Sequence, residues 1–297
     1  PWYGADALVH GRTPCGLERF SGGAWGTRDE HQGPNELLLC QEKYAEAKQV
    51  LQLLFSRQNL DGGWPQWWMF DRYRSVRADG AHGDVVYWCV LALCSYIKAS
   101  GDFAILDEPL PYFHEQGTQP AAAEPISEHI DRLFKLVVDS FVPGTALVQF
   151  GGGDWNDSLQ PVSKDLARRM ISSWTVQMSY QAFSEYREVC VRRGDSRKAK
   201  VLQDSAQRIL ADFQRYLVRD GVVAGYGLVA ADRGIDVLLH PTDAQTGVHY
   251  SLLPMNRGVI SGGGKHTLSV AVDVISLTAK TDESASRGQS QSSGNTG

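Results

Sequence analysis

Two acids, an indole and an amide lie within four residues of one another behind three consecutive glycines, in the run GGGDWNDSLQP at 151–161. Asp154 and Asp157 are carboxyl groups of the kind that act as a general acid or support one. Trp155 offers a flat face for a pyranose ring. Glycine allows positive φ and a close approach of ligand to backbone, but Gly and Asp also build ordinary turns. From chemistry alone, a sugar-cleaving site and a plain turn both stay open.

The run resembles the DWND signature of the cellobiose-phosphorylase-like enzymes, glycoside hydrolase family 94 and related inverting β-glucan phosphorylases. Two further stretches resemble segments of the same family: residues 25–32 resemble GFRD..QD, and residues 100–113 resemble TGD…ILDE.VPF. The three motifs share the family's order and spacing, so the resemblance covers roughly residues 1 to 261.

The resemblance implies inverting phosphorolysis of a β-glucoside, cellobiose or another β-linked gluco-oligosaccharide, to α-glucose 1-phosphate. Such a reaction needs one acid for the leaving oxygen and a nucleophile on the opposite face of the sugar. Inorganic phosphate is that nucleophile, so one acid suffices, and by resemblance it is Asp157. We expect an apolar wall such as Trp155, or the neighbouring Asp154, to keep this acid protonated near neutral pH. The alternative role for Asp157 is the N-cap of a helix beginning at Ser158.

The resemblance also places charged residues around the donor glucose. Asp84 is our first choice there and Arg77 the second, because aspartate accepts from sugar hydroxyls and arginine donates to two of them. Arg72 and Arg74 lie in the same segment as Arg77, and each of these arginines could instead belong to a solvated charge cluster.

Two more candidates come from the ends of the matched region. Arg28 and Asp29 match the RD pair of the family, either as sugar ligands or as a structural ion pair beneath the site. His249 belongs to a polar stretch, 240–250, that the resemblance places near the donor site, where we expect it to contact substrate. A single histidine is more often a structural group.

Helices must position these residues. Apolar residues recur every three or four positions over 35–55, 127–141, 166–178 and 202–217, which predicts helices with one buried face. The almost continuous apolar run 85–97 predicts a helix buried on most sides. Period-two alternation is nearly absent, so the predicted class is all-α. The resemblance implies an (α/α)6 toroid of the six-hairpin glycosidase type, which we expect to be incomplete in this chain.

We expect this partial catalytic domain to span 1–261. Residues 262–297 are rich in Ser, Gly, Gln and Thr, and we interpret them as a low-complexity tail, disordered or frame-shifted. The family continues with further helices and the rest of its phosphate pocket, so activity of this chain alone is open. Two alternatives remain: an inverting hydrolase on the same fold, and a non-catalytic truncated fragment.

The composition argues against several other classes of function. A net charge of -5 gives no basic surface for nucleic acid or an anionic membrane, and no run of 18 apolar residues is present. Five scattered cysteines without CxxC spacing predict reduced thiols in the cytoplasm and no metal site. We expect a small carbohydrate and inorganic phosphate as partners, with phosphate as co-substrate and no cofactor. A homodimer is expected only for a full-length parent.

Overall fold

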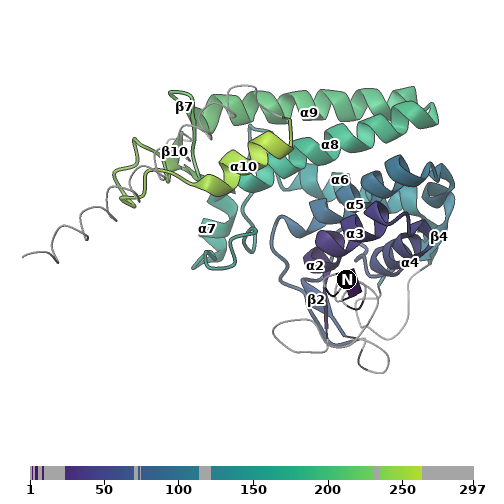
Figure 1. Cartoon of the computed structure of the whole chain (residues 1–297). Coiled ribbons are helices and arrows are strands. Elements are labelled where there is room, and N and C mark those ends of the chain that lie inside the picture. The colour runs from purple at the N-terminus through teal and green to yellow at the C-terminus, as the bar shows by residue number, and fades with distance from the viewer. Residues whose placement is uncertain are drawn as a thin grey trace, which may run out of the picture.

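The computed structural model of the chain describes residues 24–69, 75–113, 122–230 and 234–262, with the single positions 2, 4, 5, 9 and 73. In this part the chain is mainly helical, which confirms the predicted class (Figure 1). The helices are α2 (Thr27–His31), α3 (Gly33–Cys40), α4 (Tyr44–Phe55), α5 (Val85–Ser100), η2 (Phe103–Asp107), α6 (Ile126–Asp139), α7 (Lys164–Arg169), α8 (Ser173–Arg193), α9 (Ser196–Tyr216) and α10 (Leu252–Ile260). Closure of the helices into a toroid stays a prediction.

Short strands lie in the segments before and between these helices. They are β1 (Trp25–Gly26), β2 (Trp67–Trp68), β3 (Arg77–Ala78), β4 (Pro109–Pro111), β5 (Ala123–Pro125), β6 (Met170–Ser172), β7 (Val218–Arg219), β8 (Val222–Val223), β9 (Tyr226–Val229) and β10 (Ile235–Leu238). β2 pairs antiparallel with β1 and β3, and β9 pairs antiparallel with β6 and β10. Strands of two to four residues are too short to show period-two alternation, so the sequence pattern does not predict them.

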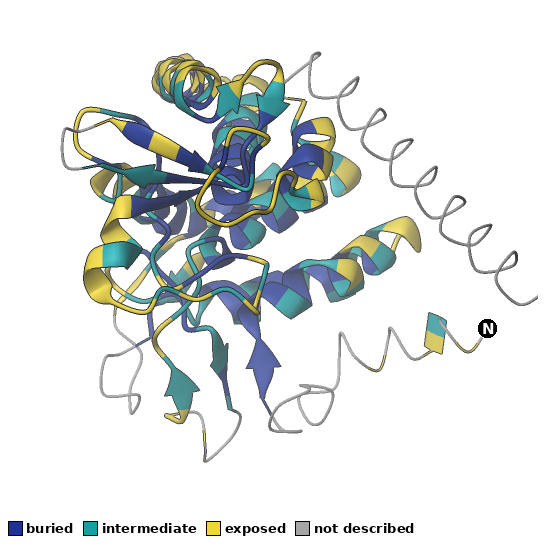
Figure 2. Cartoon of the chain, turned by 90° about the vertical axis from the view of Figure 1, so that its left-hand side faces the viewer, coloured by how far each residue is buried: buried dark blue, intermediate teal, exposed yellow. Residues whose placement is uncertain are grey.

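The helices α8 and α9 form a long hairpin and lie side by side (Figure 1). Gly194, with φ of 87°, ends α8, and the Asp195 side chain caps α9 by accepting from the backbone N–H of Lys198. α10 packs on α8, where Gln177 Nε2 donates to the carbonyl of Pro254 at 2.8 Å. Figure 2 shows buried residues gathered in the interior and exposed residues on the outer helix faces.

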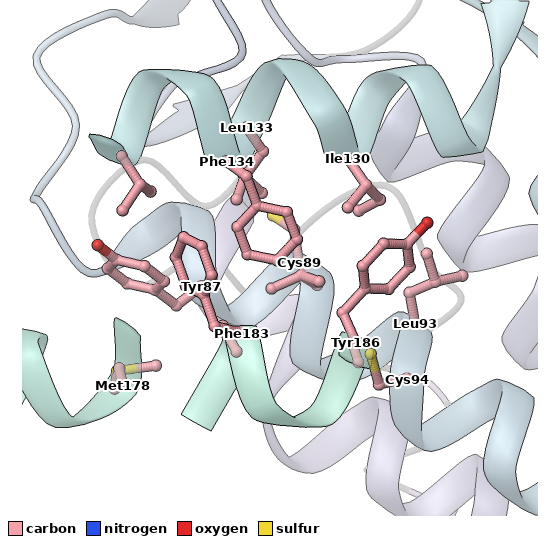
Figure 3. Close-up of a cluster of buried hydrophobic side chains, with 14 of the residues drawn as sticks. Tyr87, Cys89, Leu93, Cys94, Ile130, Leu133, Phe134, Met178, Phe183 and Tyr186 are labelled. Atoms are coloured by element: carbon pink, nitrogen blue, oxygen red, sulfur yellow. The ribbon is translucent and has the colours of Figure 1, made fainter. Parts of the chain in front are cut away.

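The core lies around α5, as its continuous apolar sequence predicts. Side chains of α5, α6 and α8 converge there, and Figure 3 shows Phe134 of α6 facing Phe183 of α8, with ring centroids 4.3 Å apart. The four described cysteines are free, and burial raises the pKa of the Cys89 and Cys94 thiols well above its ordinary value. These two cysteines are therefore core thiols, as predicted.

Two predicted helices are interrupted. The pattern over 35–55 predicts one helix, but α3 ends at Cys40 and α4 begins at Tyr44, with Glu42 between them at φ of 55°. A left-handed residue cannot continue an α-helix, so the chain changes direction there. The pattern over 166–178 is divided into α7, β6 and α8, where the Ser172 side chain caps α8 by accepting from the backbone N–H of Thr175.

Protonation of buried His31 should make stability depend on pH. Burial lowers the pKa of His31 from 6.5 to about 4, against the opposing hydrogen bond that its Nδ1 donates to the Thr27 carbonyl. Between pH 6.5 and 4, His31 is therefore protonated in the unfolded chain and neutral in the folded chain. The stability that is present above pH 6.5 is lost as the pH falls through this window. We expect this residue to account for a loss of about 3 kcal/mol in unfolding free energy.

Urea denaturation at a series of pH values tests this expectation. The variant His31→Gln carries no ionisable group there, so its unfolding free energy should fall less between pH 6.5 and 4 than that of the wild type. Equal pH dependence of the two proteins would assign the acid sensitivity to other groups.

Candidate active site

The GGGDWNDSLQP run folds as an irregular loop between α6 and α7. Side chains of the run form its turns: Asp154 Oδ1 accepts from the backbone N–H of Asn156 at 2.8 Å, and Asn156 Oδ1 accepts from that of Ser158 at 3.3 Å. No helix begins at Ser158, so the alternative role of Asp157 as a helix N-cap is wrong.

The three glycines allow this loop to lie directly against the segment that precedes Asp84. The backbone N–H of Gly83 donates to the carbonyl of Gly153 at 2.8 Å. A Cβ on Gly152 would lie 2.8 Å from the carbonyl oxygen of Ala81, closer than a carbon atom can approach. The glycines therefore permit contact between two backbone segments, whereas the sequence suggested contact with a ligand.

The substitution Gly152→Ala should therefore separate the two segments. We expect a loss of stability of about 1 to 3 kcal/mol, because the clash is with backbone and no side chain can move aside. Gly80→Ala is the matched control, since a Cβ on Gly80 meets nothing within 4 Å. Thermal unfolding compares the two variants, and equal midpoints would contradict this account of the glycines.

Arg28, on α2, joins the three aspartates of the site. Its Nη2 donates to both carboxylate oxygens of Asp157, at 2.8 and 3.0 Å. Its Nη1 lies 3.8 Å from Asp84 Oδ1 and 3.4 Å from the carbonyl oxygen of Asp154. Burial opposes the charge of this guanidinium, but the bond to Asp157 and the carboxylate charges outweigh burial and raise the pKa of Arg28. Asp29 adds only its nearby charge, so the expected structural pair of Arg28 with Asp29 is replaced by pairs with Asp84 and Asp157.

The carboxyl group of Asp157 faces solvent. Its side chain is 63% exposed, and His82 Nδ1 lies 3.3 Å from Asp157 Oδ1. The same His82 nitrogen lies 3.0 Å from the carbonyl oxygen of Asp154. Asp157 thus lies between a guanidinium, an imidazole and water, and the apolar wall expected around it is wrong.

Asp84 is fully buried at the start of α5. Its Oδ2 accepts from Trp88 Nε1 at 3.1 Å, while its Oδ1 has no hydrogen-bond partner among the described residues. Burial raises the pKa of Asp84, and the nearby charge of Arg28 opposes that rise. A buried carboxylate oxygen with free lone pairs can accept a hydrogen bond from a sugar hydroxyl.

Asp154 has a different environment. Both of its carboxylate oxygens are used within the protein, because Oδ1 holds Asn156 and Oδ2 accepts from Ser172 Oγ at 2.6 Å. Burial and the charge of Asp154 together raise the pKa of the Tyr226 hydroxyl. These contacts support the expected role of Asp154 in holding the loop.

Trp155, two residues before Asp157, forms an exposed aromatic surface. It is 41% exposed, and its Nε1 donates to Gln32 Oε1 at 3.2 Å. Its ring centroid lies 5.7 Å from that of Trp174, which lies 6.5 Å from that of Trp88. An indole supported by a second indole can pack against the apolar face of a pyranose. The sequence pattern places Trp88 and Trp174 only on helices, so it does not show their position at the site.

Arg77 has partners of its own. Its Nη1 donates to Asn59 Oδ1 at 2.8 Å, its Nε lies 2.6 Å from Asp79 Oδ1, and its guanidinium lies 4.3 Å from the ring centroid of Phe113. The structure therefore does not bring Arg77 into contact with Asp157. Arg72 and Arg74 lie outside the described residues.

His249 is exposed in the loop before α10, and no contact between it and Asp157 is present in the described part of the chain. The preceding polar residues contact the backbone of their own loop and of β7. Asp243 Oδ2 accepts from the backbone N–H of Leu239 at 2.8 Å, and buried His240 Nε2 lies 3.1 Å from the Arg219 carbonyl. These groups hold the loop together.

A helical domain that presents one accessible carboxyl beside a buried carboxylate, an arginine and an exposed indole has the features of glycoside-cleaving enzymes. Residues 20–283 match the glycosyl hydrolase 94 superfamily catalytic domain, and the chain belongs to this family. The match confirms the resemblance and extends past residue 262, where the described structure ends.

The chain is 38% identical over 263 residues to the 1,2-beta-oligoglucan phosphorylase of Listeria innocua serovar 6a (strain ATCC BAA-680 / CLIP 11262). That alignment covers 88% of this chain and 24% of the relative, so the chain spans about a quarter of the relative's length. Among solved structures, the GH78 family rhamnosidase of Bacillus sp. GL1 is similar, with a TM-score of 0.55, 13% identity and coverage of 83% of this chain and 22% of that one. This likeness concerns the fold alone.

Within the described residues, no helix is long and apolar enough to cross a membrane, and no group of three or more His, Cys, Asp or Glu is placed to hold a metal ion.

Proposed function

We propose that this chain supplies the acid and donor-sugar side of inverting phosphorolysis, in which inorganic phosphate converts a β-linked gluco-oligosaccharide to α-glucose 1-phosphate. One observation carries the proposal. Of the three aspartates around Arg28, Asp157 alone is exposed, whereas Asp84 is buried and Asp154 is fully hydrogen-bonded. A hydrolase needs a second carboxylate to activate water, whereas phosphate attacks without one.

The residues divide the work as follows. Asp157, in its acid form, donates its proton to the leaving glycosidic oxygen. Phosphate attacks the anomeric carbon from the opposite face, so the old C–O bond breaks as the new one forms, and β configuration becomes α. Asp84 Oδ1 accepts a hydrogen bond from a donor-glucose hydroxyl, and the exposed ring of Trp155 packs against the apolar face of the sugar. Arg28 positions the Asp157 carboxyl, and its contacts with both oxygens stabilise the carboxylate that remains after the proton has been transferred.

The substrate to test first follows from the relative's name. We propose a β-1,2-linked glucan, with β-1,4-linked cellobiose as the comparison. The purified protein is incubated with phosphate and each oligosaccharide, and α-glucose 1-phosphate is measured with a coupled enzyme. The proposal predicts that the sugar phosphate forms from the β-1,2-linked substrate. Absence of the sugar phosphate from every β-linked gluco-oligosaccharide would overturn it.

The alternative of a non-catalytic fragment predicts an incompletely packed chain. Such a chain would expose inner helix faces and melt without cooperativity. A single cooperative thermal transition of the 297-residue protein would count against this alternative.

A further inference from the structure

The two buried arginines of the described residues differ in their partners. Arg28 contacts the carboxylates of Asp84 and Asp157. Arg257, on α10, is 3% exposed and forms no ion pair with any carboxylate in the described part of the chain. Its Nη2 donates to Gln181 Oε1, and its Nε has no hydrogen-bond partner. The charges of Asp84 and Glu185 act on Arg257 only from beyond ion-pair distance. A buried charge is costly without a close counter-ion, so this guanidinium is suited to an anion from outside the chain.

Arg257 adjoins the sugar site. Its Cζ lies 5.5 Å from the ring centroid of Trp88 and 5.3 Å from that of Trp174. Trp88 donates to Asp84 Oδ2, and the Trp174 ring packs against Trp155. The Arg257 guanidinium therefore contacts Trp88, which bonds to Asp84, and Trp174, which packs against Trp155. Asp84 and Trp155 are the residues assigned to the donor glucose.

Unpaired polar atoms gather at the same place, where α5, α8 and α10 meet. Trp174 Nε1 and Arg257 Nε are buried donors without partners, and Asp84 Oδ1 is a buried acceptor without one. Native proteins leave few such groups unpaired. An oxyanion next to a sugar hydroxyl supplies the matching acceptors and donor.

We propose that Arg257 binds the phosphate group of the reaction, beside Asp84 and between Trp88 and Trp174. This inference rests on the proposed function and names the residue that supplies the positive charge. A guanidinium donates to two phosphate oxygens at once, and the phosphate is either inorganic phosphate or that of α-glucose 1-phosphate. Burial lowers the pKa of Arg257 to about 10, so the group is still a cation at neutral pH.

The test compares the wild type with Arg257→Met, Arg257→Lys and the control Arg208→Met, which changes an exposed arginine of α9. Inorganic phosphate, α-glucose 1-phosphate and a neutral β-glucoside are titrated separately. Tryptophan fluorescence is followed, because two indoles flank the guanidinium. Thermal midpoints are measured with and without each compound, since a ligand that binds the folded state raises the midpoint.

We expect one or both phosphate compounds to change the fluorescence and raise the midpoint of the wild type and of Arg208→Met. Arg257→Met should bind them about ten- to a hundredfold more weakly, and Arg257→Lys should fall between. Without phosphate, Arg257→Met should be at least as stable as the wild type, because it removes a buried charge that has no carboxylate within ion-pair distance. A purely structural Arg257 would instead make Arg257→Met less stable and leave the phosphate response unchanged.

The outcomes separate the two proposals. If Arg257→Met keeps the wild-type response to both phosphate compounds, the assignment of Arg257 is overturned and phosphorolysis stands. If the wild type responds to neither compound but binds the neutral β-glucoside, the assignment is also overturned. In that case release of α-glucose 1-phosphate, measured separately, decides whether phosphorolysis fails as well.

Discussion

Asp157→Asn is expected to lower kcat for phosphorolysis by about a thousandfold, since asparagine cannot protonate the leaving oxygen. The fold should persist, because the side chain is 63% exposed and asparagine has the same shape. Substrate KM should change little, because Asp84 and Trp155 remain in place. The activity of Asp157→Asn on a nitrophenyl β-glucoside should fall much less, because the nitrophenolate leaving group departs without a proton.

The matched control is Asp165→Asn, which changes another exposed aspartate paired with an arginine, Arg169. It should keep wild-type activity and stability. Steady-state kinetics with both substrates check the prediction. Phosphorolysis by Asp157→Asn within tenfold of the wild-type rate would show that another group is the acid.

Arg28→Met is expected to destabilise the protein by about 3 kcal/mol, because it leaves the buried carboxylate of Asp84 without the cation that lies within ion-pair distance of it. The loop should also loosen, since Arg28 contacts the Asp154 carbonyl and both oxygens of Asp157. Activity should fall with it. Unfolding by urea measures the change in free energy.

A double variant shows whether the uncompensated charge is the cause. Arg28→Met combined with Asp84→Asn removes both charges, so it should be more stable than Arg28→Met alone. Arg169→Met, which breaks an exposed pair with Asp165, is the control and should cost less than about 1 kcal/mol. If the double variant is no more stable than Arg28→Met, the buried pair is not what stabilises this site.

The helices could be predicted because their signal is local. The apolar run at 85–97 lies within α5, and the pattern at 202–217 matches α9. The break between α3 and α4 at Glu42 could not be predicted, because a residue with positive φ does not change the spacing of the apolar residues on either side. The short strands escaped prediction because their pairing depends on contacts between distant segments.

The sequence predicts several residues of the site, but it does not predict which of them contact one another. Asp157 and Asp84 come from motifs, but their shared partner Arg28 is 129 residues away from Asp157. Trp174 and Arg257 carry no motif, and their position depends on how α8 and α10 pack. Spacing within one element cannot show which elements meet, so these two residues needed the structure.

The most direct measurement of the central claim is proton NMR of the anomeric product while the protein acts on a β-1,2-linked gluco-oligosaccharide, with and without phosphate. Inverting phosphorolysis predicts that α-glucose 1-phosphate accumulates from the first turnover, and that reaction stops when phosphate is removed. Free glucose released at the same rate without phosphate would contradict the account and identify a hydrolase.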